Sequence, residues 1–201
     1  MKGMFHFVIE PLDERYNNKK EINGSELILN TELHNHNYVS RLGRVKYVPA
    51  NDENDIEPGD TVIVHHNVFR RFRDIRGDEK NSKSYCKENE YFVQPDQIFA
   101  YQKSCKCGWN ACKGFNFVKP IKETKMFSIN FEKPLVGVMY LADPELKNIK
   151  HGDIVGFSPS SEYEFIIENH RLYRVPTNSI TIKYGRQTNE EEYNPSWAAG
   201  G

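Results

Sequence analysis

Four cysteines are the residues of this sequence best suited to metal or redox chemistry. They are Cys86, Cys105, Cys107 and Cys112, and the last three lie together in the segment CKCGWNAC. A structural zinc site usually takes its cysteines from a C-x2-C knuckle, whereas these three follow a C-x-C-x4-C spacing with a distant fourth member. The spacing favours reduced thiols in a connector, and a small zinc module is the alternative.

Histidines supply the other candidate ligands. His34 and His36 lie in a polar stretch, and His65 and His66 are adjacent. On a strand, neighbouring side chains point to opposite faces, so His65 and His66 are expected not to chelate one ion together. His34 and His36 are spaced to share a face, but a solvated loop pair suits their surroundings better. No spacing of Asp, Glu and His forms a catalytic dyad and no P-loop is present, so we expect neither an enzyme nor a nucleotide site.

One short apolar segment stands out within a long polar region. Residues 23–30 read NGSELILN and carry three consecutive aliphatic residues, Leu27, Ile28 and Leu29. The triplet is either a strand that pairs inside the fold or an exposed binding segment on a flexible loop. The flanks NNKKEINGSE and NTELHNHN contain little to bury, and Asn23-Gly24 is a turn signal. These flanks favour the loop.

Length and composition bound the class of protein. The chain has 201 residues, which fits one large domain or two small ones. Its formal net charge of −1 argues against a nucleic-acid binder, whose phosphate contacts need an excess of Lys and Arg. No run of apolar residues is long enough for a membrane span, and the N-terminus lacks the features of a signal peptide. We therefore expect a cytoplasmic protein, with no membrane or nucleic-acid partner.

The pattern of apolar residues predicts an all-β fold. Short alternating or apolar runs such as FHFVIEPL, DTVIVHHNVF and SITIKY recur along the chain, each bounded by Gly, Pro, Asn or Asp. No long segment shows a helical period.

Two halves of the chain repeat the same elements. The segment RVKYVPANDENDIEPGDTVIVHHN, from Arg44, aligns with GVMYLADPELKNIKHGDIVGFSPS, from Gly137, at a constant offset of 93 (152 − 59). The matched pairs are Val45 with Val138, Tyr47 with Tyr140, Ile56 with Ile149, Gly59 with Gly152, and Asp60 with Asp153. In each Gly-Asp turn, Gly is expected to adopt a positive φ and Asp to bond backbone amides. We predict domains at 1–101 and 114–185, a cysteine-containing linker at 102–113, and a flexible polar tail at 186–201.

The two copies differ in one connection. Residues 13–42 separate the first two strands of copy one, whereas copy two has the much shorter KETKMFSINFEKPLV. The segment with Leu27, Ile28 and Leu29 is therefore an insertion, and long connections inside compact domains are usually functional or disordered.

The order of features in the first half resembles the GroES-type co-chaperonins, the lids of the GroEL-type chaperonin chamber. In that family an early strand leads into a long mobile loop with a glycine and a short aliphatic tripeptide. A strand with Gly and Val follows, then a Gly-Asp-x-Val turn and strand, a hairpin and a last strand. Here the parts read FVIEPL, NGSELILN, GRVKYV, EPGDTVIV and ENEYFVQPDQIFAY. The resemblance covers roughly residues 5–101 and, more weakly through the repeat, 114–185.

This resemblance implies two tandem GroES-like small β-barrels with a mobile loop, about 13–42, in the first. It implies that Leu27, Ile28 and Leu29 dock into the chaperonin's apical groove, with Gly24 as the loop glycine, although Ser25 and Glu26 intervene. Further matches are Gly43 and Val45 on the strand leaving the loop, and Gly59, Asp60 and Val62 at the turn and strand. The implied partners are a GroEL-type chaperonin and further copies of this chain in a ring, expected to be a heptamer. ATP and Mg²⁺ would be bound by the chaperonin, and no cofactor by this chain.

Several features depart from the family pattern. The link PANDENDIEP is too short for a roof hairpin, RRFRDIRGDEKNSKSYCKEN is an extra insertion, and the second copy lacks the long loop. These departures suggest a divergent relative, encoded by a bacteriophage and acting in the host cytoplasm. The alternative function is that of a structural β protein in a viral particle. A dehydrogenase that shares the GroES-like fold is disfavoured because the chain has no GxGxxG motif.

Overall fold

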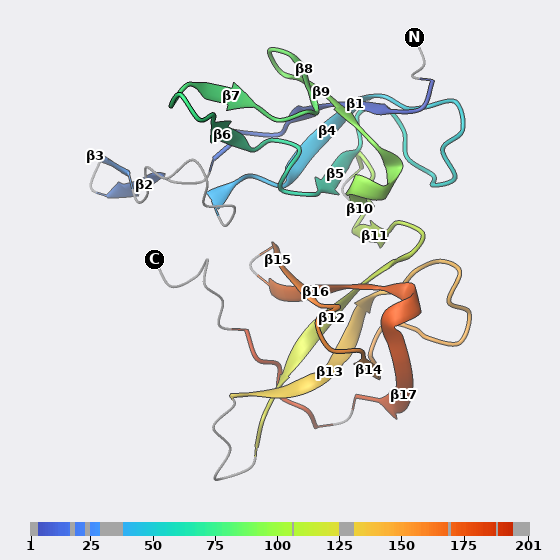
Figure 1. The fold of residues 1–201 in the computed structure, drawn as a ribbon. Coiled ribbons are helices and arrows are strands. Elements are labelled where there is room, and N and C mark those ends of the chain that lie inside the picture. Colours follow the sequence, from blue (N-terminus) through green and yellow to red (C-terminus); the bar gives the residue numbers. More distant parts are fainter. Residues whose placement is uncertain are drawn as a thin grey trace. The chain divides into compact units, whose positions relative to one another are not determined.

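A computed structural model describes residues 4–16, 19–22, 25–28, 38–105, 107–124, 131–168, 170–187 and 189–194. For residues 19–22 and 25–28 it describes the backbone alone. The chain divides into two compact units, Met1–Trp109 and Asn110–Gly200 (Figure 1). The boundary between them falls inside the predicted linker, residues 102–113.

The first unit is built on one antiparallel sheet. Its strands lie in the order β11-β10-β5-β4-β1-β9-β8, and β11 is the strand at which the second unit begins. Two hairpins stand apart from this sheet, β2 with β3 and β6 with β7. The elements are β1 (Phe7–Pro11), β2 (Lys19–Ile22), β3 (Ser25–Ile28), β4 (Leu42–Tyr47), β5 (Thr61–Val64), β6 (Arg71–Arg73), β7 (Glu79–Asn81), β8 (Tyr85–Lys87), β9 (Glu90–Val93), the 3-10 turn η2 (Pro95–Gln97), β10 (Ile98–Gln102) and β11 (Trp109–Ala111).

The second unit has one sheet with the strand order β15-β16-β12-β13-β14-β17. Its elements are β12 (Phe115–Lys122), β13 (Glu132–Leu141), β14 (Asp153–Phe157), β15 (Tyr163–Ile167), β16 (His170–Pro176), the 3-10 turn η3 (Thr177–Ser179) and β17 (Ile180–Arg186). Strand order is thus the same in both units. The series β10-β5-β4-β1-β9-β8 corresponds to β17-β14-β13-β12-β16-β15. A short 3-10 turn precedes β10 in the first unit, and another precedes β17 in the second.

The shared topology supports the internal repeat but corrects its register. Gly43 pairs with Pro11 and Val62, and Gly137 pairs with Pro120 and Val155, so the two glycines are equivalent and lie 94 residues apart (137 − 43). Val45 therefore corresponds to Met139, not to Val138 as the sequence comparison predicted. Val62 and Val155, the partners of these glycines on the next strand, lie 93 residues apart (155 − 62). The offset changes because the segment from Gly43 to Val62 is one residue longer than the segment from Gly137 to Val155.

Burial follows the alternation expected for half-buried strands. In β9, Tyr91 and Val93 are buried while Phe92 is exposed, and in β4 the buried Val45 follows the exposed Arg44. Edge-to-face aromatic pairs lie inside both units. Phe69 and Tyr91 have ring centroids 4.9 Å apart in the first, and the centroids of Phe117 and Phe165 are 5.8 Å apart in the second. Such a pair contributes about 0.5–1.5 kcal/mol beyond the area that it buries.

The all-β prediction is confirmed, since the described helical turns are two short 3-10 segments. The predicted barrels, however, are open sheets by strand pairing. Among the described residues, β8 and β11 end one sheet, and β15 and β17 end the other. Each end strand pairs on one side only, so the two end strands of a sheet are not hydrogen-bonded to each other and the sheet is not closed into a barrel.

Part of the predicted flexible tail is bound to the second unit. Glu192 forms an antiparallel bridge with Ile121, and the Tyr193 amide donates to the Pro120 carbonyl at 2.9 Å. The Arg171 amide donates to Asn194 Oδ1 at 2.8 Å. These contacts extend the ordered fold to Asn194.

Gly137 is the glycine where a side chain would meet the least space. A Cβ added there would lie 2.7 Å from the Lys119 carbonyl oxygen, a backbone atom held by strand pairing. We expect Gly137→Ala to lower the free energy of unfolding by about 1–3 kcal/mol, because the two strands must separate. Gly43→Ala, whose nearest contacts are 3.1 Å, should cost less. Urea unfolding of both variants checks the ranking, and an equal cost would contradict it.

Candidate functional site

The predicted docking segment lies on a hairpin outside the main sheet. Leu27 and Ile28 belong to β3, where they pair with Lys20 and Lys19 of β2. The sequence left open whether the triplet is a strand inside the fold or a loop segment, and the backbone of Leu27 and Ile28 is a strand in a separate two-stranded ribbon (Figure 1). Gly24 and Leu29, also predicted to bind the chaperonin, lie outside the described residues.

The two ends of this connection meet at a fixed root. Tyr16 forms an antiparallel bridge with Val39, and the Ser40 amide donates to the Arg15 carbonyl at 2.9 Å. Tyr16, Val39 and Ser40 are all buried. The two ends of the connection between β1 and β4 are therefore held together at Tyr16 and Val39.

The extra insertion holds this root in place. Arg15 donates through Nη2 and Nε to the Phe69 carbonyl at 2.8 and 3.0 Å, and through Nη1 to Asn81 Oδ1 at 2.8 Å. The Arg71 amide donates to the Tyr16 hydroxyl at 2.6 Å. The sequence showed residues 70–89 only as an insertion, and these contacts identify it as the support of the loop root.

Arg15→Met tests that support. The variant leaves the Phe69 carbonyl without its donor, so we expect the free energy of unfolding to fall by about 1–3 kcal/mol. Arg44→Met is the matched control, because Arg44 is exposed on β4 and its loss should cost under about 0.5 kcal/mol. Urea unfolding monitored by tyrosine and tryptophan fluorescence measures both, and equal midpoints would show that Arg15 does not hold the root.

The two Gly-Asp turns have the same geometry. Gly59 has a φ of +97° and Gly152 a φ of +83°, a region that favours glycine. Asp60 Oδ2 accepts from the Glu57 amide at 2.9 Å, and Asp153 Oδ2 accepts from an amide at 2.8 Å. The second donor is Lys150, three residues before Asp153, as Glu57 is before Asp60. Each aspartate thus closes the turn that leads into the next strand.

A lysine near the end of each sheet completes these turns, and sequence reasoning missed both. Lys183 Nζ lies 2.6 Å from Asp153 Oδ2 and 2.8 Å from the Asn148 carbonyl. Lys103 Nζ lies 3.5 Å from Asp60 Oδ2 and also donates to the Asp55 carbonyl. Asp55 and Asn148 are 93 residues apart (148 − 55), so the two lysines occupy matching sites. No local sequence pattern marks them, because Lys183 on β17 and Lys103 just after β10 are far along the chain from the turns that they contact.

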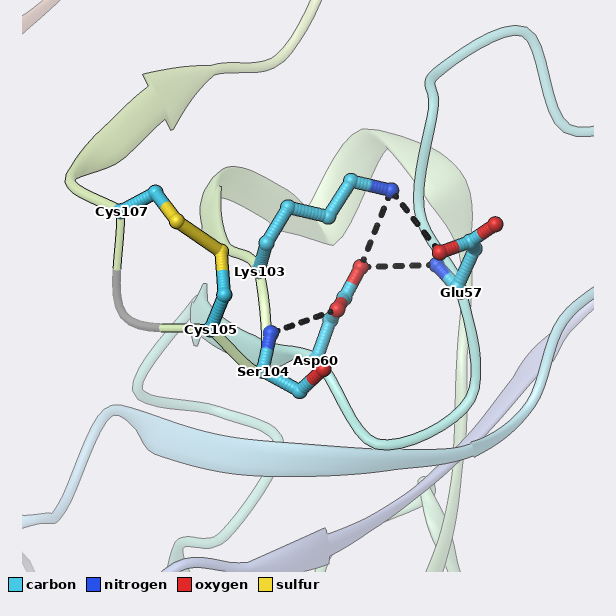
Figure 2. The surroundings of a disulfide bond; sticks show 6 residues. All are labelled: Glu57, Asp60, Lys103, Ser104, Cys105 and Cys107. Carbon is cyan, nitrogen blue, oxygen red and sulfur yellow. Dashed lines mark hydrogen bonds and ion pairs between the residues drawn. A yellow bond between two sulfur atoms is a disulfide. The ribbon is translucent and has the colours of Figure 1, made fainter.

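The turn of the first unit also holds the chain beside the predicted cysteine site. Figure 2 shows Ser104 donating its amide to Asp60 Oδ1, at 3.1 Å, immediately before Cys105. Cys105 and Cys107 form a disulfide. The expectation of four reduced thiols is therefore wrong for this pair, because the single intervening residue lets their Cα atoms lie 5.4 Å apart, a normal distance for a disulfide.

The predicted zinc candidates are not brought together. Cys86 is exposed on β8 and Cys112 is buried, and neither is in a disulfide. No group of three His, Cys, Asp or Glu side chains that could hold a metal occurs within the described part of the chain. His65 and His66 follow the end of β5, so the strand rule does not apply, and their ring centroids lie 4.2 Å apart. His34 and His36 lie outside the described residues.

A half-buried polar cluster in the second unit holds the start of β13. Arg171 donates to Glu132 at 2.5 Å and to Glu164 at 2.9 Å, and the Tyr173 hydroxyl donates to Glu132 at 2.8 Å. Burial, and then its hydrogen bond with Glu132, raise the pKa of Tyr173. The Tyr173 phenol therefore stays protonated at neutral pH and keeps its role as hydrogen-bond donor to Glu132.

Helices long and apolar enough to cross a membrane do not occur among the residues described above. Neither a protein-family model nor a curated protein matches this sequence.

Proposed function

We propose that this protein is a co-chaperonin that caps a GroEL-type chaperonin ring in an ATP-dependent cycle and assists protein folding. The order of elements in the first unit carries the proposal. β1 leads to a rooted connection with an aliphatic segment, the chain returns in β4 with Gly43 and Val45, and the Gly59-Asp60 turn then leads into β5. This is the order on which the GroES-like resemblance rests.

The proposed mechanism is docking of Leu27, Ile28 and Leu29 into an apolar groove of the chaperonin. Burying three aliphatic side chains stabilises the contact by about 1.5–3 kcal/mol each, and ordering the loop offsets part of this. The root at Tyr16 and Val39 confines the ordering cost to the residues between them. Each contact is therefore weak, and the contacts of a ring act together through effective concentration.

The second unit has a much shorter connection at the equivalent place. Its connection between β12 and β13 covers only residues 123–131, against 12–41 between β1 and β4. One chain thus contributes one docking loop, and a ring of seven chains contributes seven. ATP and Mg²⁺ belong to the chaperonin, which releases the lid when its groove changes. The proposed site of action is the cytoplasm, where disulfides are usually transient, so the Cys105–Cys107 bond is expected to be reducible there.

Co-sedimentation with a GroEL-type chaperonin tests the proposal. The wild-type chain should sediment with the chaperonin when ATP is present and remain in the supernatant without nucleotide. Lysozyme in place of this chain controls for trapping in the pellet. Absence of nucleotide-dependent binding to the chaperonin of the cognate host would overturn the proposal and favour the structural protein of a viral particle.

A further inference from the structure

A groove on the first unit combines an apolar half with a cationic half. The apolar half, about 520 Å³, is lined by Met4, Phe5, Val8 and Phe92 together with polar neighbours. Three of these side chains are exposed although they are large and apolar: Met4 at 73%, Phe5 at 64% and Phe92 at 48%. An exposed cluster of this kind marks a binding surface more often than an isolated exposed side chain does.

The cationic half, about 550 Å³, is lined by Arg70, Arg73 and Lys83 with the uncharged side chains of Asn67, Phe72, Ser82, Ser84 and Gln97. Lys83, Ser84 and Gln97 line both halves, so the two halves adjoin at these residues. Among the described residues, no carboxylate lines either half. The groove therefore joins a positive region directly to an apolar one.

The three cations of the groove have no acidic partner in the described part of the chain. The nearby acids are engaged elsewhere: Glu79 pairs with Arg71 at 2.7 Å, and Asp74 and Asp78 pair with Lys80. The Nε atom of Arg70 is buried with no hydrogen-bond partner among the described atoms. In a chain of net charge −1, an unbalanced cluster of three cations favours an anionic ligand.

The edge strand β8 starts directly after Lys83 and Ser84. It is the last strand of its sheet and pairs only with β9, so one side of its backbone is unpaired in the described sheet (Figure 1). Extended peptides bind such edges through main-chain hydrogen bonds, with adjoining pockets for alternate side chains. A free phosphate would use the cationic half alone, and a neutral apolar peptide the other half alone.

We propose that this groove binds an extended acidic peptide segment that carries a large apolar side chain. Carboxylates pair with Arg70, Arg73 and Lys83, and the apolar side chain packs against Phe92 and Phe5. The site lies on β1, β6 and β8–β9 and their flanks, and is separate from the proposed docking segment on β3. It is independent of the co-chaperonin proposal.

Fluorescence anisotropy with labelled peptides tests this inference. EEFEEL should bind the full chain, and both the charge-reversed KKFKKL and the apolar-deficient EEGEEG should bind at least about tenfold more weakly. Arg73→Gln/Lys83→Gln should weaken EEFEEL binding at least about tenfold, whereas Phe92→Ser should remove the preference for EEFEEL over EEGEEG. The substituted side chains are exposed, so folding should be retained, and circular dichroism checks this.

The matched control is Arg76→Gln/Lys147→Gln, which removes the same charge from exposed positions that do not line the groove. It should leave EEFEEL affinity within about twofold of wild type. An equal loss in the control variant would show non-specific charge attraction and overturn the inference. The inference would also be overturned if the wild-type chain bound none of the peptides, or if it bound EEGEEG as tightly as EEFEEL. In the second case, displacement of EEFEEL by millimolar pyrophosphate would indicate a site for anions alone.

Discussion

Replacing Leu27, Ile28 and Leu29 together by aspartate is expected to weaken ATP-dependent capture by a GroEL-type chaperonin more than about a hundredfold. Each substitution removes an aliphatic contribution of about 1.5–3 kcal/mol and places a charge against an apolar groove. Because the loops of one ring bind together, the loss at each loop is multiplied in the assembled lid. Sedimentation at increasing chaperonin concentration measures the change.

A second loop variant separates this effect from that of charge. Thr31→Asp/Asn35→Asp/Asn37→Asp adds the same three negative charges to polar positions of the same connection. We expect it to bind nearly as well as wild type, since it leaves the aliphatic segment unchanged. If both triple variants lose binding equally, the loop acts through its charge and the docking role of the three aliphatic residues is wrong.

Asp153→Ala is expected to lower the free energy of unfolding by about 2–3 kcal/mol. The buried carboxylate accepts from the Lys150 amide and from Lys183, and alanine leaves both donors without this acceptor. Asp60→Ala repeats the test in the first unit, where the Glu57 and Ser104 amides lose their acceptor. Asp96→Ala is the control, because Asp96 is exposed. If Asp60→Ala and Asp153→Ala lowered the free energy of unfolding no more than the control does, these aspartates would not stabilise their turns as argued.

The cost of Asp153→Ala should depend on pH. Burial raises the pKa of the Asp153 carboxyl, but the hydrogen bonds from Lys183 and the Lys150 amide lower it by more, so it lies below the ordinary 3.8. Because this pKa is lower in the folded chain than in the unfolded chain, the carboxylate contributes its full stability at pH values above its pKa in the unfolded chain. It loses that contribution as the pH falls through its pKa in the folded chain. Urea midpoints of wild type and variant should therefore differ most at neutral pH and converge below about pH 4. A difference independent of pH would contradict the ionised hydrogen-bonded state.

The fold class and the repeat were accessible from the sequence because both rest on local patterns. Alternating apolar residues bounded by turn residues predict strands, and the Gly-Asp turns mark the same step in each half. Register was not accessible at β13. Val138 and Met139 are both apolar and both buried, so matching Val45 by identity selected the wrong neighbour. The equivalent positions are identified only by the strand partners of the two glycines, since Gly43 pairs with Pro11 and Gly137 with Pro120.

Long-range polar contacts account for what the sequence could not predict at the candidate site. Arg15 reaches the Phe69 carbonyl 54 residues away, and Lys183 reaches Asp153 30 residues away. No local sequence pattern predicts hydrogen bonds between residues so far apart along the chain. The end of β5 was not predictable from the sequence either. The strand ends at Val64, so His65 and His66 lie beyond it and the alternation of side chains along a strand does not hold for them. The open sheets likewise depend on which strands pair, which composition does not specify.

Amide hydrogen exchange across residues 23–30 tests the central proposal most directly. The chain is exchanged alone, with a GroEL-type chaperonin, and with the chaperonin and ATP. The proposed docking predicts slower exchange of the amides of residues 25–29 only when chaperonin and ATP are both present, with the same protection absent in the triple aspartate variant. A stable complex in which these amides exchange as fast as in the free chain would contradict the proposal, because the aliphatic segment would then take no part in binding.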